Sequence, residues 1–257
     1  MPGDLERAAG LLGAARRVVV FTGSGISAES GVPTFRDDLT GLWARFDAER
    51  LATPEAFDAD PDLVWGWYEW RRARARAAEP NAGHRAVAAV EARLPGTTVV
   101  TQNVDDLHER AGSRDPIHLH GSLFAPRCTA PAGHPAAFPA GGTEPDEGRR
   151  IPPPRCASCG APVRPGVVWF GEALPVAAFS AAVDAATACD VLLSVGTSGV
   201  VYPAAEIPRI AAITGAAVVQ VNPEPTPMDE LYAANLRGTA AAVLPALVAA
   251  AWPGERG

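Results

Sequence analysis

Lysine is absent from this chain of 257 residues, so all 22 of its basic residues are arginines. Together with 29 acidic residues they leave a formal net charge of −7, which argues against a nucleic-acid binder but allows basic protein tails as partners. The codon bias of a GC-rich genome explains the missing lysine and the abundant alanine, proline and glycine. A chain without lysine also cannot carry a modified lysine side chain of its own.

Long apolar segments and cysteines are also scarce. The longest apolar tract, Ala240–Trp252, contains Pro245 and falls short of the ~20 residues that span a bilayer. The N-terminus carries Asp4 and Glu6, which predicts an amphipathic helix and not a signal peptide. Four cysteines, two of them in a Cys-x-x-Cys pair, suit metal binding or redox use in a reducing compartment better than a disulfide framework. We therefore expect a cytoplasmic protein with no membrane partner.

Short apolar runs alternate with helical patterns over much of the chain. Continuous runs such as Val191–Val195 are typical of buried parallel strands, and stretches such as Val176–Cys189 have helical spacing. The expected strands are 18–21, 99–101, 117–119, 167–170, 191–195 and 217–221, and the expected helices are 5–16, 176–189, 202–213 and 240–252. This alternation predicts an α/β fold with a doubly wound parallel sheet, that is, a Rossmann-like domain.

Two segments break the alternation. Residues 39–85 lack strand patterns, are rich in aromatic residues and are expected to be helical. Residues 126–166 contain ten prolines and six glycines, which exclude regular structure over most of their length. We expect a smaller inserted domain made of a helical module, 37–85, and a cysteine-containing module, 126–166. The Rossmann-like domain would then comprise residues 1–36, 86–125 and 167–257.

A glycine-rich turn follows the first expected strand. Gly23-x-Gly25-x-x-Ala28 matches the dinucleotide-binding turn, in which one glycine makes the tight turn and the next lets backbone N–H groups approach a pyrophosphate. Ala28 would let helix and strand pack closely. The turn continues with Glu29-Ser-Gly-x-Pro-Thr-Phe-Arg36, which a generic Rossmann turn does not require, and the usual acidic ribose ligand about 20 residues further on is not evident. The pattern indicates a dinucleotide used for something other than routine hydride transfer.

Polar residues follow the other expected strands. These groups are Gln102-Asn-Val-Asp105, His120-Gly-Ser122, Gly196-Thr-Ser198 and Asn222-Pro-Glu224. Ligands of parallel sheets bind at the carboxyl ends of the strands, so these groups are expected to converge with the glycine-rich turn on one site.

With these motifs the sequence resembles the sirtuins, NAD-dependent protein-lysine deacylases, from Val18 to Leu247. The matching motifs are Gly-Ser-Gly-x-Ser-x-Glu-Ser-Gly-x-Pro-Thr-Phe-Arg, Thr101-Gln-Asn-Val-Asp105, His118-Leu-His-Gly121, Val168-Trp-Phe-Gly-Glu172 and Gly196-Thr-Ser198. Ser24 replaces the alanine that is commoner in the family, a small change that should be tolerated.

The resemblance implies a set of NAD-binding residues. They are Gly23, Ser24, Gly25, Ile26, Ser27, Ala28, Glu29, Thr34, Phe35, Arg36, Gln102, Asn103, Val104, Asp105, Gly196, Thr197, Ser198, Asn222, Glu224 and Ala240. Asn103 and Asp105 would hold the nicotinamide amide and its ribose, and Phe35 and Arg36 the loop that closes over the cofactor.

The resemblance also implies the catalytic residues, His120 and Asn103. In the family's chemistry the acyl-lysine carbonyl oxygen attacks the anomeric carbon of the nicotinamide ribose and expels nicotinamide. His120 would then deprotonate a ribose hydroxyl and allow its attack on the O-alkylimidate, a proton transfer that suits an imidazole with a pKa near 6.5. Val168, Trp169, Phe170 and Gly171 would offer a strand edge to the extended substrate peptide.

Two residues bear on the acyl group. Tyr68 and Arg71 stand three positions apart in an expected helix and so share one face. Spacing alone favours a tyrosine in an aromatic core beside a solvated arginine. Within the sirtuin resemblance the pair matches the class III residues that bind a carboxylate on the acyl group, and Ala48 matches the small residue that makes room for it. A phenol and a guanidinium can grip a carboxylate by charge-assisted bonds.

The cysteines depart from the family pattern of two pairs that bind a structural zinc. Cys156 and Cys159 form one pair, but Cys128 is followed three residues later by Pro131 in place of a ligand. Tetrahedral zinc needs four ligands. Either His134 completes the set with the three cysteines, or this module binds no metal.

The sequence leaves several functions open. The leading hypothesis is an NAD-dependent deacylase that removes succinyl or malonyl groups, and acetyl groups more weakly, from lysine in protein substrates. The alternatives are a plain protein-lysine deacetylase, a mono-ADP-ribosyltransferase and a non-catalytic NAD sensor. The presence of His120 and Asn103 argues against a sensor.

Overall fold

The computed structural model describes residues 2–32, 47–130, 134, 136 and 149–254. The predicted cofactor-binding residues Thr34, Phe35 and Arg36, and also Pro131, lie outside the described residues. The longer helices are α1 (Pro2–Ala14), α4 (Pro54–Ala59), α5 (Pro61–Ala77), α6 (Ala82–Arg93), α8 (Val176–Ala188), α9 (Glu206–Ile213) and α10 (Ala240–Ala251). The shorter ones are α2 (Gly25–Ala28), α3 (Ala48–Leu51), α7 (Leu107–Arg110) and the 3₁₀ helix η2 (Asp229–Leu231). The strands are β1 (Val18–Thr22), β2 (Thr97–Thr101), β3 (Ile117–His118), β4 (Gly121–Cys128), β5 (Val163–Val167), β6 (Val191–Val195), β7 (Ala217–Val221) and β8 (Ala234–Leu236).

Six parallel strands form the main sheet in the order β3-β2-β1-β6-β7-β8. Numbered along the sheet's own strands, this is the order 3-2-1-4-5-6 of the Rossmann fold. The chain adds strands on one side of β1 up to β3 and then on the other side from β6 onward. The carboxyl ends of β1 and β6 therefore flank the switch point, where ligands of such sheets bind.

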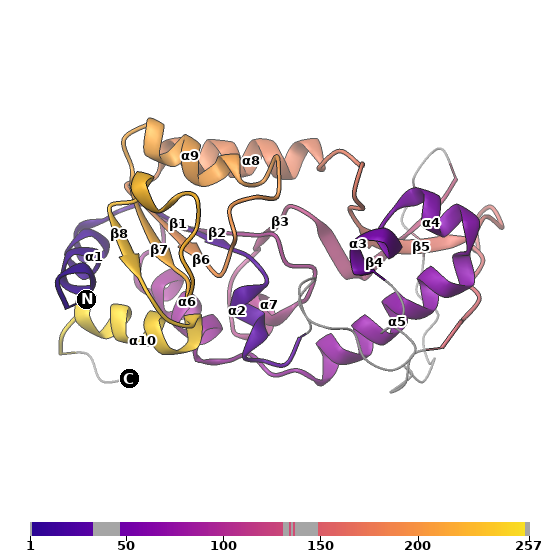
Figure 1. Ribbon diagram of the computed structural model, residues 1–257, viewed down its shortest axis with the longest axis horizontal. Coiled ribbons are helices and arrows are strands. Elements are labelled where there is room, and N and C mark those ends of the chain that lie inside the picture. Colours follow the sequence, from indigo (N-terminus) through magenta and orange to yellow (C-terminus); the bar gives the residue numbers. More distant parts are fainter. Residues whose placement is uncertain (1, 33–46, 131–133, 135, 137–148, 255–257) are drawn as a thin grey trace.

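Helices cover both faces of this sheet. Figure 1 shows α8 and α9 on one face and α1, α6 and α10 on the other. Neighbouring residues of β1 alternate between the two cores: Val18 and Val20 pack toward α1, α6 and α10, whereas Val19 and Phe21 pack toward α8 and α9. Burial on both faces explains why the strands are continuous apolar runs and not alternating ones. The predicted doubly wound α/β fold is confirmed.

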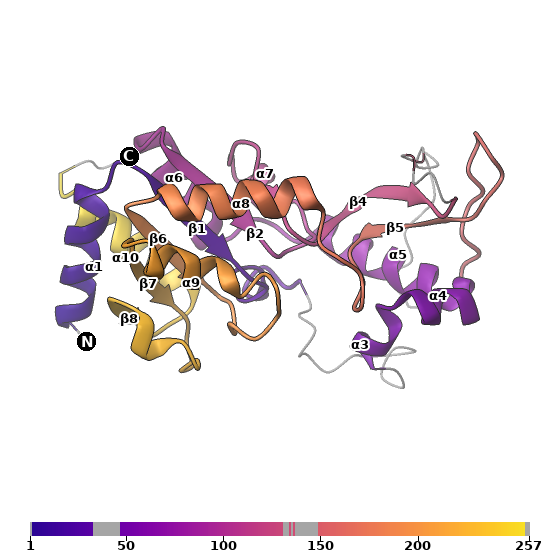
Figure 2. The same cartoon turned by 90° about the horizontal axis from the view of Figure 1, so that it is seen from above.

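A second lobe lies at one end of the molecule (Figures 1 and 2) and contains α3, α4, α5 and the antiparallel pair β4–β5. Its core packs Trp67 and Tyr68 of α5 against Leu123 of β4 and against Val167 and Trp169. Helix α5 begins where the Asp60 carboxylate accepts a hydrogen bond of 3.1 Å from the Leu63 N–H, with proline in the first turn. This lobe contains the helices and the cysteine module that were expected outside the Rossmann-like sheet.

The structure corrects the expected strand at residues 167–170. Strand β5 ends at Val167, and the following residues connect the two lobes, with Phe170 and Gly171 in a turn. The Val168 N–H donates to the His120 carbonyl at 2.8 Å, and the Phe170 N–H donates to the Ala52 carbonyl at 2.9 Å. The segment is apolar and its backbone is hydrogen-bonded to both lobes, so its sequence resembles that of a strand. It nevertheless belongs to neither sheet.

Two other boundaries differ from expectation. Helix α9 begins at Glu206 and not at Tyr202, because a turn precedes it. Strand β4 spans the predicted domain boundary at residues 125 and 126, so a continuous strand connects the two lobes there. The division into two domains stays a prediction. None of the described helices is both long and apolar enough to cross a membrane.

Candidate functional site

One cavity of about 430 Å³ opens at the carboxyl ends of β1, β2 and β6 and continues between the lobes. Most of the predicted site residues line it. Those on the cofactor side are Gly23, Ser24, Gly25, Ser27, Gln102, Asn103, Val104, Asp105, His120, Gly196, Thr197, Ser198 and Asn222. Those on the predicted substrate side are Tyr68, Arg71, Val168, Trp169, Phe170 and Gly171. Residues from distant parts of the sequence, from Gly23 to Asn222, therefore meet at one site.

Several predicted residues do not reach the cavity wall. Ile26 and Ala48 are buried in the two cores. Glu29 is exposed and accepts a hydrogen bond of 3.1 Å from the Ala241 N–H, which ties it to the start of α10. Ala240 is buried in that first turn and Glu224 is exposed. At the position expected for Ala48, the wall is formed by Glu49 and Ala52.

The glycine-rich turn is held by the end of β6. The Gly23 N–H donates to the Val195 carbonyl, and the Gly25 N–H donates to the Gly196 carbonyl, both at 2.9 Å. These two N–H groups therefore bond within the chain. A Cβ on Gly25 would lie 2.7 Å from the Gly196 Cα, and one on Gly196 would lie 2.5 Å from the Ile26 N. The glycines let two loops touch.

Ala28 also differs from its expected role. Its side chain is exposed, so it does not provide close packing between helix and strand. Ile26, which is fully buried, makes that contact instead. The short helix α2 turns the side chain of its second residue, not its fourth, toward the sheet.

Asn103 and Asp105 form the inner end of the cofactor side. The Asn103 side-chain amide donates to the Ser27 hydroxyl at 3.1 Å, and its backbone N–H donates to the Thr101 hydroxyl at 3.0 Å. Asp105 accepts from the Leu107 N–H at 3.1 Å, and burial raises its pKa. These amide and hydroxyl groups, with Gln102 and the 196–198 loop, suit a carboxamide and ribose hydroxyls. The donor set fits NAD.

Two buried histidines lie behind this end of the cavity. His84 lies 3.4 Å from the Ser27 hydroxyl through Nε2, and His108 lies 3.0 Å from the Thr22 hydroxyl through Nε2. Their rings are 5.1 Å apart. Burial lowers the pKa of His84 to about 4 and that of His108 to about 3, so both are neutral near pH 7. His84 also completes a capping box with Asn81 at the start of α6. Its contact with Ser27 had no sequence signal.

His118 and His120 are two residues apart, but their pKa values shift in opposite directions. His118 faces the Asn103 carbonyl at 3.0 Å and the Glu109 carboxylate at 2.7 Å, so both ring nitrogens have acceptors. Burial opposes its protonation, but Glu109 outweighs burial and raises its pKa. The His120 Nδ1 lies 3.0 Å from the Gln102 carbonyl, and burial lowers the pKa of this ring. A carbonyl can only accept, so Nδ1 carries the proton and the basic lone pair is on Nε2.

Tyr68 and Arg71 lie together at the substrate end. The Arg71 guanidinium carbon is 5.1 Å from the Trp67 ring centroid and 5.8 Å from that of Tyr68. Burial lowers the pKa of Arg71, whereas Tyr68 and Asp105 raise it. The solvated arginine that spacing alone favoured is wrong: Arg71 and its neighbour Arg72 are buried, whereas Arg74 and Arg76 further along α5 are exposed.

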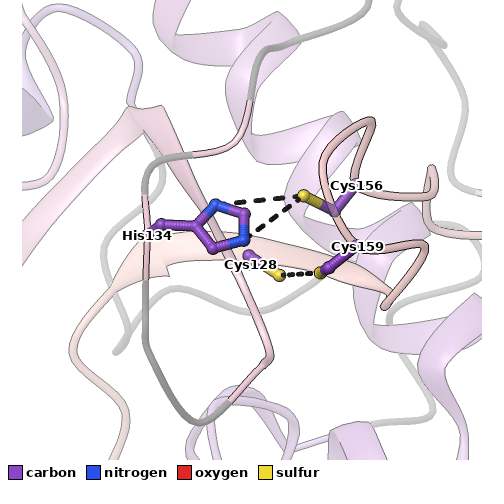
Figure 3. Close-up of side chains that lie close together, drawn as sticks. All are labelled: Cys128, His134, Cys156 and Cys159. Atoms are coloured by element: carbon purple, nitrogen blue, oxygen red, sulfur yellow. Dashed lines mark hydrogen bonds between the residues drawn. The ribbon is translucent and has the colours of Figure 1, made fainter.

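Cys128, His134, Cys156 and Cys159 form a cluster in the small lobe, drawn in Figure 3. Their candidate ligand atoms all lie within 4.8 Å of one another. The Cys128 and Cys159 sulfurs are 3.3 Å apart, and the Cys156 sulfur is 3.7 Å from the His134 Nε2. Ligands in tetrahedral zinc sites lie roughly 3.5–3.8 Å apart, from bond lengths of about 2.1–2.3 Å.

The cluster fits a zinc ion with three thiolates and one imidazole. The Ala130 N–H donates to the Cys128 sulfur at 3.3 Å, a contact that stabilises a metal-bound thiolate. The four residues join the end of β4 to the turn before β5, and Cys128 and Cys156 pack against Trp65. A zinc ion here would be structural, because its ligands are separate from the residues that line the cavity.

Comparisons with known proteins agree with this architecture. The model of the Sir2 family matches residues 23–203. NAD-dependent protein deacylase 1 of Pseudomonas aeruginosa is 62% identical over 245 residues, which cover 95% of this chain and 98% of that protein. The NAD-dependent protein deacylase of Methylococcus capsulatus is 60% identical over 239 residues, which cover 92% of each.

Solved structures agree as well. A Sir2 homologue in complex with NAD superposes with a TM-score of 0.85 at 44% identity, covering 96% of this chain and 93% of that one. Sir2Af2 bound to a myristoylated histone peptide has a TM-score of 0.77 at 35% identity, covering 98% and 97%. The fold, the cavity and these relatives lead to one conclusion: the chain belongs to the Sir2 family.

Proposed function

We propose that this chain is an NAD-dependent protein-lysine deacylase that prefers acyl groups ending in a carboxylate, namely succinyl and malonyl, over acetyl. The observation that carries the proposal is that one cavity joins the dinucleotide edge of the sheet, His120 and the Tyr68–Arg71 pair. The relatives named as NAD-dependent deacylases and the NAD complex support the cofactor and the reaction.

The residues of this chain divide the work along the cavity. NAD supplies an electrophilic ribose carbon whose nicotinamide can leave. Asn103 and Asp105 would hold that end, since their polar groups are buried and already oriented by Ser27 and Leu107. His120 would accept a proton from a ribose hydroxyl at Nε2, because the Gln102 carbonyl holds Nδ1–H. Acyl-lysine, NAD and one water molecule give nicotinamide, the free lysine and 2′-O-acyl-ADP-ribose.

The acylated peptide would lie along residues 168–171. The N–H groups of Val168 and Phe170 donate to main-chain carbonyls, and that of Trp169 donates to the Glu172 carboxylate at 2.8 Å. Because these N–H groups are already used, an extended peptide would hydrogen-bond to the carbonyl groups of this segment. The predicted strand-edge binding is therefore limited to carbonyl acceptors.

The preference for an acidic acyl group rests on the charge at the substrate end. Arg71 is 9% exposed, so its positive charge is largely removed from water. A desolvated guanidinium beside a phenol binds a carboxylate strongly, because charge-assisted bonds gain strength where water does not compete. An acetyl group offers nothing to this pair.

A mass-spectrometric assay with NAD and matched acetyl-, malonyl- and succinyl-lysine peptides tests the proposal. We expect free nicotinamide and acyl-ADP-ribose, with the succinyl and malonyl peptides consumed fastest. ADP-ribosylated protein without loss of the acyl group would show a transferase instead, and binding of NAD without products would show a sensor.

Arg71→Met tests the acyl preference. One charge-assisted hydrogen bond contributes about 1.5–3 kcal/mol, so the variant should lose roughly 10- to 150-fold in kcat/KM for succinyl-lysine. Acetyl turnover should change far less. An equal loss for both substrates would mean that Arg71 supports the fold, and the preference for acidic acyl groups would be wrong.

We also propose a cytoplasmic location. All four cysteines are free thiols, and three of them lie in the metal cluster. Thiols that serve as ligands persist in a reducing compartment. Fractionation with an antibody against the native protein would test this.

A further inference from the structure

Trp169 is held on three sides at the substrate end of the cavity. Its backbone N–H donates to Glu172, the same carboxylate that pairs with the Arg164 guanidinium through bonds of 2.6 and 2.9 Å. The Arg164 guanidinium carbon lies 3.3 Å from the centroid of the indole ring. The indole is 3% exposed. Stacking on Arg164 and the backbone hydrogen bond to Glu172 together fix the orientation of the Trp169 ring.

The edge of this indole meets the acyl-binding tyrosine. The Trp169 Nε1–H donates to the Tyr68 hydroxyl oxygen at 3.0 Å, in a fully buried contact that joins residues 101 positions apart. An indole N–H is only a donor, so the tyrosine must be the acceptor in this bond.

Arg71 adds a second donor beside the same hydroxyl, since a hydrogen bond with Tyr68 is among the interactions that raise its pKa. A guanidinium also cannot accept. Burial raises the pKa of Tyr68 to about 12, so the phenol keeps its proton. Neither neighbour can receive that proton, so it is available to an acceptor in the cavity that Tyr68 lines.

We propose that Trp169 is a specificity-determining positioning residue: its indole N–H orients the Tyr68 hydroxyl to donate to the ligand, so that the substrate end selects acyl groups that end in a hydrogen-bond acceptor. This inference rests on the proposed function and names a residue that acts through Tyr68. Without the indole N–H, only Arg71 still donates to this hydroxyl, so the O–H is less firmly oriented and presents a lone pair to the acyl carboxylate part of the time.

Trp169→Phe is the first test, because it keeps an aromatic ring over Arg164 and removes the N–H. The succinyl-to-acetyl ratio of kcat/KM should fall about three- to tenfold, the usual effect of one hydrogen bond. The loss should appear mainly in the KM for succinyl-lysine. Trp252→Phe, at the end of α10 in the other lobe, is the matched control and should leave the ratio unchanged.

A double-mutant cycle with Tyr68→Phe separates positioning from packing. In the Tyr68→Phe background there is no hydroxyl to orient, so adding Trp169→Phe should not lower the ratio further. A fall by the same factor in both backgrounds would overturn the proposal. If Trp169→Phe does not fold, benzothienylalanine at position 169 removes the N–H and keeps the two-ring shape.

The proposed function and this inference fail in different ways. Absence of deacylation with every peptide in the unmodified protein would reject the function. Deacylation with an unchanged succinyl-to-acetyl ratio in the Trp169 variants would reject the inference alone.

Discussion

The two ends of the cavity are held together by different parts of the chain. At the cofactor end, main-chain groups of Gly23, Gly25 and Gly196 bond to neighbouring strand ends, with no space for a side chain between the loops. At the substrate end, side chains hold side chains: Trp169 contacts Tyr68 and stacks on Arg164. Loops in direct backbone contact, here called the glycine interlock of Gly23, Gly25 and Gly196, tolerate little change. Contacts between side chains can be altered by one substitution at a time. The difference indicates that cofactor choice is rigid and acyl choice is adjustable.

Gly196→Ala should give the largest effect. The residue has φ +59°, and a Cβ would meet the Ile26 N at 2.5 Å, so the two loops must separate. We expect loss of NAD binding by calorimetry together with a lower melting temperature. Gly215→Ala is the control, because that glycine also has positive φ, +98°, but a Cβ there meets nothing within 4 Å. If both variants bound NAD equally well, the interlock would not hold the cofactor end.

His120→Ala should come next, with turnover about 10²–10⁴-fold lower and NAD binding retained. Because burial lowers the pKa of His120, the ring stays neutral below its ordinary value of 6.5. The acid limb of the kcat/KM profile should therefore fall below pH 6.5 and vanish from the residual activity of the variant. An acid limb above pH 7 would contradict the assignment of His120 as a neutral base.

The zinc cluster offers a smaller perturbation away from the cavity. Protein purified without chelator should contain about one zinc per chain, and Cys159→Ser or His134→Ala should lower the metal content and the melting temperature. Cys189→Ser, a thiol outside the cluster, should change neither. Full zinc content in His134→Ala would remove the imidazole from the ligand set, and metal-free wild-type protein would show that the site binds none.

The smallest effect concerns the buried pair His84 and His108. Their pKa values in the folded protein, about 4 and about 3, lie below the ordinary 6.5, so the unfolded chain takes up protons first as the pH falls. Stability is therefore complete above pH 6.5 and is lost as the pH falls toward 4. When the pH is lowered from 7 to 6, the two histidines together should reduce the free energy of unfolding by roughly 1 kcal/mol.

Urea unfolding at several pH values measures this slope. His108→Gln should reduce it, because one of the two titrating groups is removed. An identical slope in the variant would mean that other groups cause the acid sensitivity.

The sequence predicted the cofactor end better than the substrate end for the same structural reason. Residues such as Gln102–Asp105 and Gly196–Ser198 follow apolar strands directly, so local pattern places them at one edge of the sheet. The pairing of Trp169 with Tyr68 joins two elements through tertiary packing, which spacing does not encode. The burial of Arg72 is similar: its Nε–H donates to the Leu123 carbonyl at 2.9 Å, a contact that a run of arginines does not suggest.

The glycine interlock has a consequence for how this protein can change over generations. Gly25 and Gly196 each occupy the space that a side chain on the other would need. A larger residue at either position would clash with the backbone of the other. Because the other position is already glycine, no second substitution there can make room for it. Sequence variation at the cofactor end must therefore pass through neighbours such as Ser24 and Thr197, whose side chains face the cavity. A saturation library should show invariant positions at Gly23, Gly25 and Gly196, bordered by permissive ones.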